Sequence, residues 1–158
     1  MQLLFILTLL FTRSTLVVTS STFVEGGMIP AAYTCDGKNI SPDINVTEIP
    51  EGTKRLVLVM EDPDADGGTF DHWLSFDIIP GGKIKENADP GVKGLNGKGS
   101  TGYIGPCPSS GIHHYHFKVY ALDTPLNLRE GAGRKMVEDA MKDHILAEGE
   151  LIGIYKRK

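Results

Sequence analysis

Four side chains that could bind an anion stand at the ends of predicted strands. Asp62 ends an apolar run, His72 opens the next alternating segment, and His113 and Tyr115 open a third. If residues 63–71 reverse the chain between antiparallel strands, Asp62 and His72 emerge at one sheet edge and could hydrogen-bond to each other. His113 and Tyr115 are two residues apart, so they face the same side of their strand.

These residue types suit a phosphate-like ligand. Imidazole N–H groups donate hydrogen bonds to oxyanions, and a carboxylate orients an imidazole ring and favours its protonated form. The loop at 105–111, rich in Gly and Pro, could add backbone N–H donors. The spacing therefore predicts an anion site formed by Asp62, His72 and His113, with an affinity that rises as the pH falls. In the alternative interpretation, Asp62 caps a turn and the histidines are ordinary polar residues.

Two enzyme hypotheses use the same residues. A carboxylate and two imidazoles could form a mononuclear metal site for hydrolysis or oxygen chemistry. His114 and His116 would not join it, because adjacent strand residues point to opposite faces. A Ser-His-Asp hydrolase lacks support, since no G-x-S-x-G motif is present and Ser109 and Ser110 follow a proline in a loop.

Apolar periodicity predicts the elements that must position these residues. A continuous apolar run predicts a strand buried on both faces, and alternating segments predict two more strands. Helical spacing over 134–147, with Gly149 as its stop, predicts one helix before a last strand. The predicted strands cover residues 56–60, 74–78, 115–121 and 151–155. The domain is therefore expected to be mainly β with one C-terminal helix.

Composition limits the function classes. The 158 residues are 41% hydrophobic and 23% charged, which is typical of one globular domain. The net charge of −4 argues against a nucleic-acid partner. The 19 glycines and 9 prolines show no repeat, which favours many turns between short strands.

The N-terminus bears on the cellular location. Residues 1–24 carry one charged side chain, Arg13, and the apolar run at 3–11 has the length of a signal-peptide core but is too short to span a bilayer. We therefore expect residues 1–16 to be an apolar extension, either a signal peptide or an anchor, that precedes a domain over 17–158. The protein would then be secreted or membrane-tethered. A buried first strand or an upstream start codon, with a cytoplasmic protein, is the alternative.

The two cysteines, Cys35 and Cys107, are too few for a structural zinc site. They form either one disulfide or two buried thiols, and we expect them to be close enough to bridge. A bridge would stabilise the fold by roughly 4 kcal/mol through loop closure. It would require an oxidising compartment or a thermophilic source.

Several ordered motifs resemble the phosphatidylethanolamine-binding protein family, from about Val17 to Tyr155. The signature-like segments are Asp62-Pro63-Asp64-Ala65, His72-Trp73, Gly102-Tyr103-Ile104-Gly105-Pro106-Cys107-Pro108 and Gly111-Ile112-His113-His114-Tyr115. Tyr33-Thr34-Cys35-Asp36-Gly37, Asn39-Ile40-Ser41-Pro42 and His144-Ile145-Leu146-Ala147-Glu148 are similar to the bacterial and archaeal branch often labelled Raf-kinase-inhibitor-like.

The resemblance implies a large central antiparallel sheet packed on a smaller sheet. It also implies a pocket for phosphate or a phospholipid head group, in a protein that is not an enzyme and needs no cofactor or metal. By position, the pocket residues are Asp62, His72, Gly105, Pro106, His113 and Tyr115. A kinase or serine protease inhibited through the surface loops is the alternative function, and a homodimer remains open.

The chain departs from the family pattern at two positions. His114 stands where the family has an arginine, which removes a permanent cation and the bidentate ion pair that arginine forms. Asp66 replaces the final proline of the first motif. Both changes are expected to alter the rigidity of the pocket rather than its identity.

Overall fold

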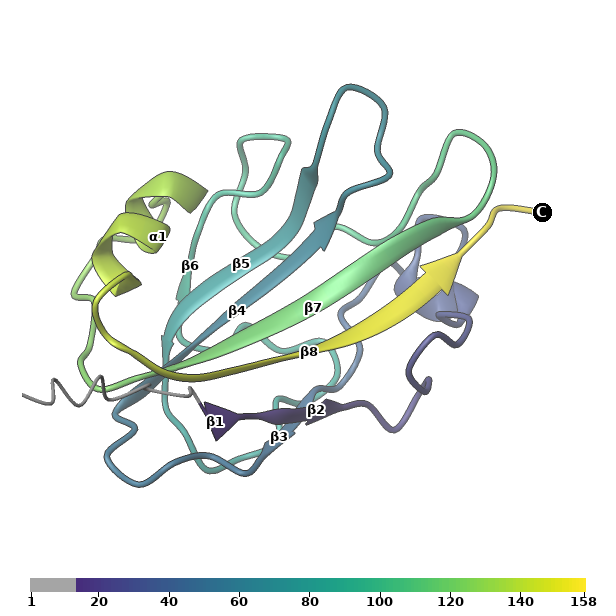
Figure 1. The fold of residues 1–158 in the computed structure, drawn as a ribbon. Helices are drawn as coiled ribbons and strands as arrows, with labels where there is room; N and C mark the ends of the chain where they lie inside the picture. Colours follow the sequence, from purple (N-terminus) through teal and green to yellow (C-terminus); the bar gives the residue numbers. More distant parts are fainter. Residues whose placement is uncertain (1–13) are drawn as a thin grey trace, which may run out of the picture.

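Six strands pair into the large sheet that positions the candidate residues. The computed structural model describes residues 14–158, and the strand order is β1-β8-β7-β4-β5-β6 (Figure 1). The strands are β1 (Ser14–Thr15), β4 (Arg55–Asp62), β5 (Phe70–Ile78), β6 (Val92–Lys93), β7 (His113–Leu122) and β8 (Ile145–Tyr155). Neighbours are antiparallel except β1 and β8, which run parallel. The expected large sheet is confirmed, with one parallel strand at its edge.

A second, smaller sheet pairs β2 (Val17–Thr19) with β3 (Asn45–Thr47). Val18 and Val46 from this sheet join Phe117 and Met60 of the large sheet in one buried cluster. Between these two strands the chain forms a short 3-10 helix, η1 (Ala31–Tyr33). The predicted arrangement of a large sheet packed on a small one is therefore confirmed.

Strand β4 is buried on both faces, as its continuous apolar sequence predicts. Leu58 and Met60 belong to the cluster beneath the small sheet, whereas Val57 and Val59 pack in a second cluster with Val137 of the helix. Successive side chains of a strand point to opposite faces, so one buried cluster lies on each face of β4. The strand lies between β5 and β7 and is central in the sheet.

The neighbouring strands follow their predicted patterns with one extension. In β7, Tyr115 and Phe117 are fully buried on one face, and His116 and Lys118 lie on the other. Strand β5 begins at Phe70, earlier than predicted. The prediction missed its first residues because they are polar or half-buried and show no apolar alternation.

The C-terminal helix is shorter than predicted. The expected range of 134–147 is wrong at its end, because α1 covers Arg134–Met141 and residues from Ile145 onward belong to β8. Strand β8 pairs with β7 over nearly its whole length, and this pairing overrides the local helical spacing. The helix still packs as its pattern indicates, with Val137 and Met141 buried.

Gly149 therefore has a different role from the predicted helix stop. It lies inside β8, where a Cβ atom would stand 2.3 Å from the carbonyl oxygen of Leu16. The N–H of Leu16 donates to the carbonyl of Glu148 at 2.9 Å. A side chain at position 149 would separate these backbones, so glycine permits the N-terminal segment to reach β8.

The N-terminal expectation lies mostly outside the described residues, which begin at Ser14. Within them, Ser14 and Thr15 pair with β8 and Leu16 is buried in the core. The packed domain therefore includes these three residues as well as 17–158. No helix in the part of the chain from 14 to 158 is long and apolar enough to cross a membrane.

Substitution Gly149→Ala is expected to lower the free energy of unfolding by about 1–3 kcal/mol, because the added methyl group collides with backbone. Urea denaturation measures this change. Gly82→Ala is the control, since no atom lies within 4 Å of the added Cβ there. A Gly149→Ala variant as stable as Gly82→Ala would contradict the close approach.

Candidate ligand-binding site

A cavity of about 330 Å³ opens where β4 ends and where β5 and β7 begin. Its walls come from the turn after β4, the start of β5, the start of β7 and two loops. The lining residues are Asp62, Ala65, Asp66, Phe70, His72, Lys98, Ile104, Gly105, Cys107, Pro108, Ser109 and His113. The structure thus brings Asp62, His72, Gly105 and His113 together, as the sequence predicts.

The pair Asp62 and His113 forms the base of the cavity. Asp62 Oδ2 lies 2.8 Å from His113 Nδ1, and both residues are buried. Asp62 Oδ1 accepts a hydrogen bond from the backbone N–H of Asp64 at 2.8 Å. Because an ionised carboxylate only accepts hydrogen bonds, His113 donates through Nδ1 and keeps Nε2 for a ligand.

His72 makes a different contact from the one expected. It does not pair with Asp62; its Nδ1–H donates to the backbone carbonyl of Ile104 at 2.7 Å. Burial lowers the pKa of His72, and the hydrogen bond to Ile104 and the charge of Asp62 only partly offset this effect. The ring is therefore neutral near pH 7, with an unprotonated Nε2.

Tyr115 supports both rings from beneath. Its fully buried ring makes an edge contact with His72, with centroids 5.2 Å apart, and stacks on His113 at 6.5 Å. Burial and the charge of Asp62 raise the pKa of the Tyr115 hydroxyl, so this group stays protonated. Tyr115 is expected to line the cavity, but its buried ring is not among the lining side chains.

The Gly-Pro loop forms one wall of the cavity. The N–H of Gly105 donates to Asn39 Oδ1 at 2.8 Å and is therefore already used. Pro106 has no N–H, its carbonyl accepts from Cys35 at 3.1 Å, and it is absent from the lining. The Gly105 amide is thus not free for a ligand, whereas the other amides of the loop stay predicted donors.

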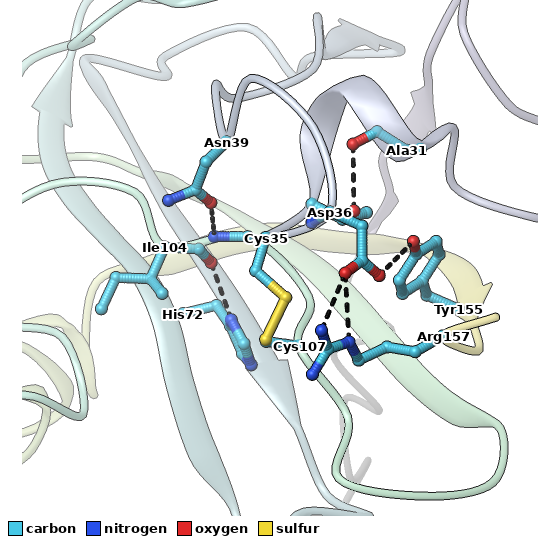
Figure 2. Close-up of a disulfide and its surroundings, with 11 residues drawn as sticks. Ala31, Cys35, Asp36, Asn39, His72, Ile104, Cys107, Tyr155 and Arg157 are labelled. Atoms are coloured by element: carbon cyan, nitrogen blue, oxygen red, sulfur yellow. Dashed lines mark hydrogen bonds and ion pairs between the residues drawn. A yellow bond between two sulfur atoms is a disulfide. The ribbon is translucent and has the colours of Figure 1, made fainter.

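A disulfide joins Cys35 and Cys107, with Cα atoms 5.4 Å apart (Figure 2). It connects the segment after η1 to the loop that lines the cavity. The Tyr103 hydroxyl reinforces this connection by donating to the Tyr33 carbonyl at 2.6 Å. Asp36, beside Cys35, accepts from Tyr155 and Arg157 of the C-terminal segment. The cavity wall is thereby linked to the end of β8.

His114 and His116 lie outside the cavity. His114 stands where an arginine was expected, and its Nδ1 lies 2.7 Å from Asp64 Oδ2, within hydrogen-bond distance. This contact lowers the pKa of Asp64. A single imidazole contact therefore stands in place of the bidentate ion pair that an arginine would form. His116 pairs with Glu150 at 3.1 Å on the opposite face from His113.

Sequence reasoning missed Lys98, Phe70 and Ser109 as cavity residues. Lys98 stands between two glycines in a loop whose backbone is held by Asn96 Oδ1. A lone lysine between two glycines is the sequence signal that could have identified Lys98 as a cavity residue. Ser109 donates to Asp66 Oδ2 at 2.8 Å across the cavity rim.

The metal hypothesis gains no geometric support. Within residues 14–158, no group of three or more His, Cys, Asp or Glu side chains is arranged to hold a metal ion. The Nδ1 atoms of His72 and His113 both donate hydrogen bonds within the protein, to Ile104 and Asp62.

Comparisons with known proteins cover nearly the whole domain. A family model described as phosphatidylethanolamine-binding protein matches residues 19–156. A UPF0098 protein of Aquifex aeolicus is 48% identical over 154 residues, covering 89% of this chain and 88% of the relative. One of Pyrococcus horikoshii is 45% identical over 150 residues, covering 88% and 76%.

Two crystal structures share the fold. CT736 of Chlamydia trachomatis, described as a homolog of phosphatidylethanolamine-binding proteins, superposes with a TM-score of 0.88 at 37% identity. The match covers 92% of this chain and 99% of the other. YbcL of Escherichia coli, described as a member of the mammalian PEBP family, gives 0.83 at 27% identity and covers 92% and 100%.

Replacing both Cys35 and Cys107 with serine is expected to lower the free energy of unfolding by about 4 kcal/mol, because the bridge closes a long loop in the unfolded chain. Urea denaturation with and without reductant measures this. Reductant should destabilise the wild type to a similar extent and leave the double variant unchanged. Insensitivity of the wild type to reductant would show that the bridge is absent.

The lowered pKa of His72 predicts a loss of stability in acid. At pH 8 the ring is neutral in both states, but as the pH falls through about 6.5 the unfolded chain takes up the proton first. The free energy of unfolding should therefore fall more steeply between pH 8 and pH 5.5 in the wild type than in His72→Asn. His144→Asn is the comparison variant, at a half-buried histidine that contacts Asp123 and does not line the cavity. Equal slopes in all three proteins would refute the buried neutral ring.

Proposed function

The chain belongs to the phosphatidylethanolamine-binding protein family, and from this premise we propose that it is a binding protein and not an enzyme. The cavity at the ends of β4, β5 and β7 binds phosphate or a small phosphorylated group such as phosphoethanolamine. Its volume of about 330 Å³ is at the lower end of the range for small-molecule sites, which suits a head group.

The hydrogen bond between Asp62 and His113 carries this proposal. The carboxylate fixes the ring with Nε2 available, and when the ring is protonated its Nε2–H donates a charge-assisted hydrogen bond to a phosphate oxygen. Lys98 lines the same cavity and adds a second cation. Asp62 itself is shielded, because both its oxygens already accept hydrogen bonds.

Inhibition of a serine protease or kinase is the second candidate function. Ile112 is 52% exposed directly before His113, so an apolar side chain protrudes beside the cavity mouth. Such a residue suits insertion into a partner's pocket. Protease and kinase inhibition assays with Ile112→Ser as the control variant test this function.

The disulfide supports a proposal about location. A bridge between Cys35 and Cys107 persists in an oxidising compartment or in a thermophile. We therefore propose a secreted or membrane-tethered protein, or a cytoplasmic protein of a thermophile. Fractionation of the native cells distinguishes these locations.

Replacement of His113 tests the ligand proposal. Calorimetric titration with phosphate should show binding weakened by about 1.5–3 kcal/mol in His113→Ala, because one charged donor is lost. In the wild type the affinity should rise from pH 8 to pH 5.5, since an imidazolium donates where a neutral ring does not.

Two further variants make this test specific. His113→Asn can still donate to Asp62 and should fold while losing the ligand-facing nitrogen. His116→Ala, on the opposite strand face, should bind as the wild type does. Equal affinities of all four proteins at both pH values would refute the proposed site.

A further inference from the structure

The hydrogen-bond state of His72 restricts what the cavity can accept. Its Nδ1–H is used by the carbonyl of Ile104, and the ring is fixed between Phe70 at 4.9 Å and Tyr115 at 5.2 Å. The remaining polar atom of this cavity-lining ring is Nε2. In the neutral ring Nε2 carries a lone pair and can only accept a hydrogen bond.

The carboxylates near His72 favour its protonated form, but burial outweighs them and leaves the ring neutral. Asp62 and Asp71 are the carboxylates whose charges act on the ring, and Asp66 lines the same cavity. His113 also contributes a charge interaction, which opposes protonation of His72. Lys98 is the lining cation among the described residues, and it is exposed. A ligand that offers only lone pairs would face the His72 lone pair without a proton between them.

Building on the proposed phosphate site, we propose that this cavity selects oxyanions that carry their own hydrogen-bond donor, such as hydrogen phosphate, over fully ionised oxyanions such as sulfate. The P–OH group of the ligand donates to His72 Nε2. The ionised oxygens face Lys98, and His113 donates to them when its ring is protonated. The site thus distinguishes two tetrahedral anions of similar size by a proton.

The same rule separates phosphate compounds. Inorganic phosphate keeps at least one P–OH group throughout the neutral range. A simple monoester such as methyl phosphate loses its last P–OH proton near pH 6, and a diester such as dimethyl phosphate has no P–OH group once ionised. Phosphate should therefore bind at pH 7.5, methyl phosphate mainly below pH 6, and sulfate and the diester weakly at both values.

Calorimetric titrations at pH 7.5 with phosphate, sulfate and dimethyl phosphate test the rule. We expect phosphate to bind the wild type at least tenfold more tightly than sulfate or dimethyl phosphate. In His72→Gln, an amide N–H can replace the ring lone pair, so the ratio of phosphate to sulfate affinity should fall to about threefold or less. His144→Gln should keep the wild-type ratio, because His144 contacts Asp123 and does not line the cavity.

The outcomes separate this inference from the proposed function. Equal binding of phosphate and sulfate by the wild type would overturn the inference and leave the phosphate site intact. An unchanged ratio in His72→Gln would exclude His72 as the discriminating group. No phosphate binding by the wild type would remove the proposed function and the inference together.

A second measurement needs no variant and covers a His72→Gln protein that does not fold. In the wild type, methyl phosphate affinity should fall at least fivefold more than phosphate affinity between pH 5.5 and pH 7.5. Parallel losses for the two ligands would overturn the inference.

Discussion

The burial of the Asp62 carboxylate is the constraint on which this end of the molecule depends. A buried charge without partners would cost several kcal/mol, so both oxygens must be satisfied within the protein. His113 satisfies one and the Asp64 amide the other. These contacts join the end of β4, the turn after it and the start of β7. The carboxylate therefore fixes the geometry of three segments before any ligand is considered.

The two sides of the cavity are held by different kinds of interaction. On the sheet side, Tyr115 packs against both imidazoles, so the orientation of each ring depends on the other. On the loop side, the disulfide and the hydrogen bond between Gly105 and Asn39 hold the wall. The ring nitrogens of His72 and His113 lie on the sheet side. The loop side forms the opposite wall of the cavity and is held by the disulfide.

The strands and the cluster at their ends could be predicted from the sequence because apolar period and turn residues are local signals. The partner of Asp62 could not. A register shift between Met60 and Glu61 places Asp62 opposite Phe70 on β5, and local sequence patterns do not show that His72 bonds to Ile104 while His113 bonds to Asp62. The end of α1 was also beyond local reasoning, since the pairing of Ile145 with Leu122 of β7 decides it. The hydrogen bond from the Gly105 amide to Asn39 could not be predicted either, because Asn39 is distant in sequence.

The pairing of β1 with β8 has a consequence for biosynthesis. Ser14 and Thr15 leave the ribosome long before their partners, Ala147 and Glu148, are made. The sheet therefore cannot close until β8 has been synthesised, and contacts this far apart in sequence form slowly. Until then, the nascent chain exposes the edge of β7 and part of the core, a state in which chaperones have time to act.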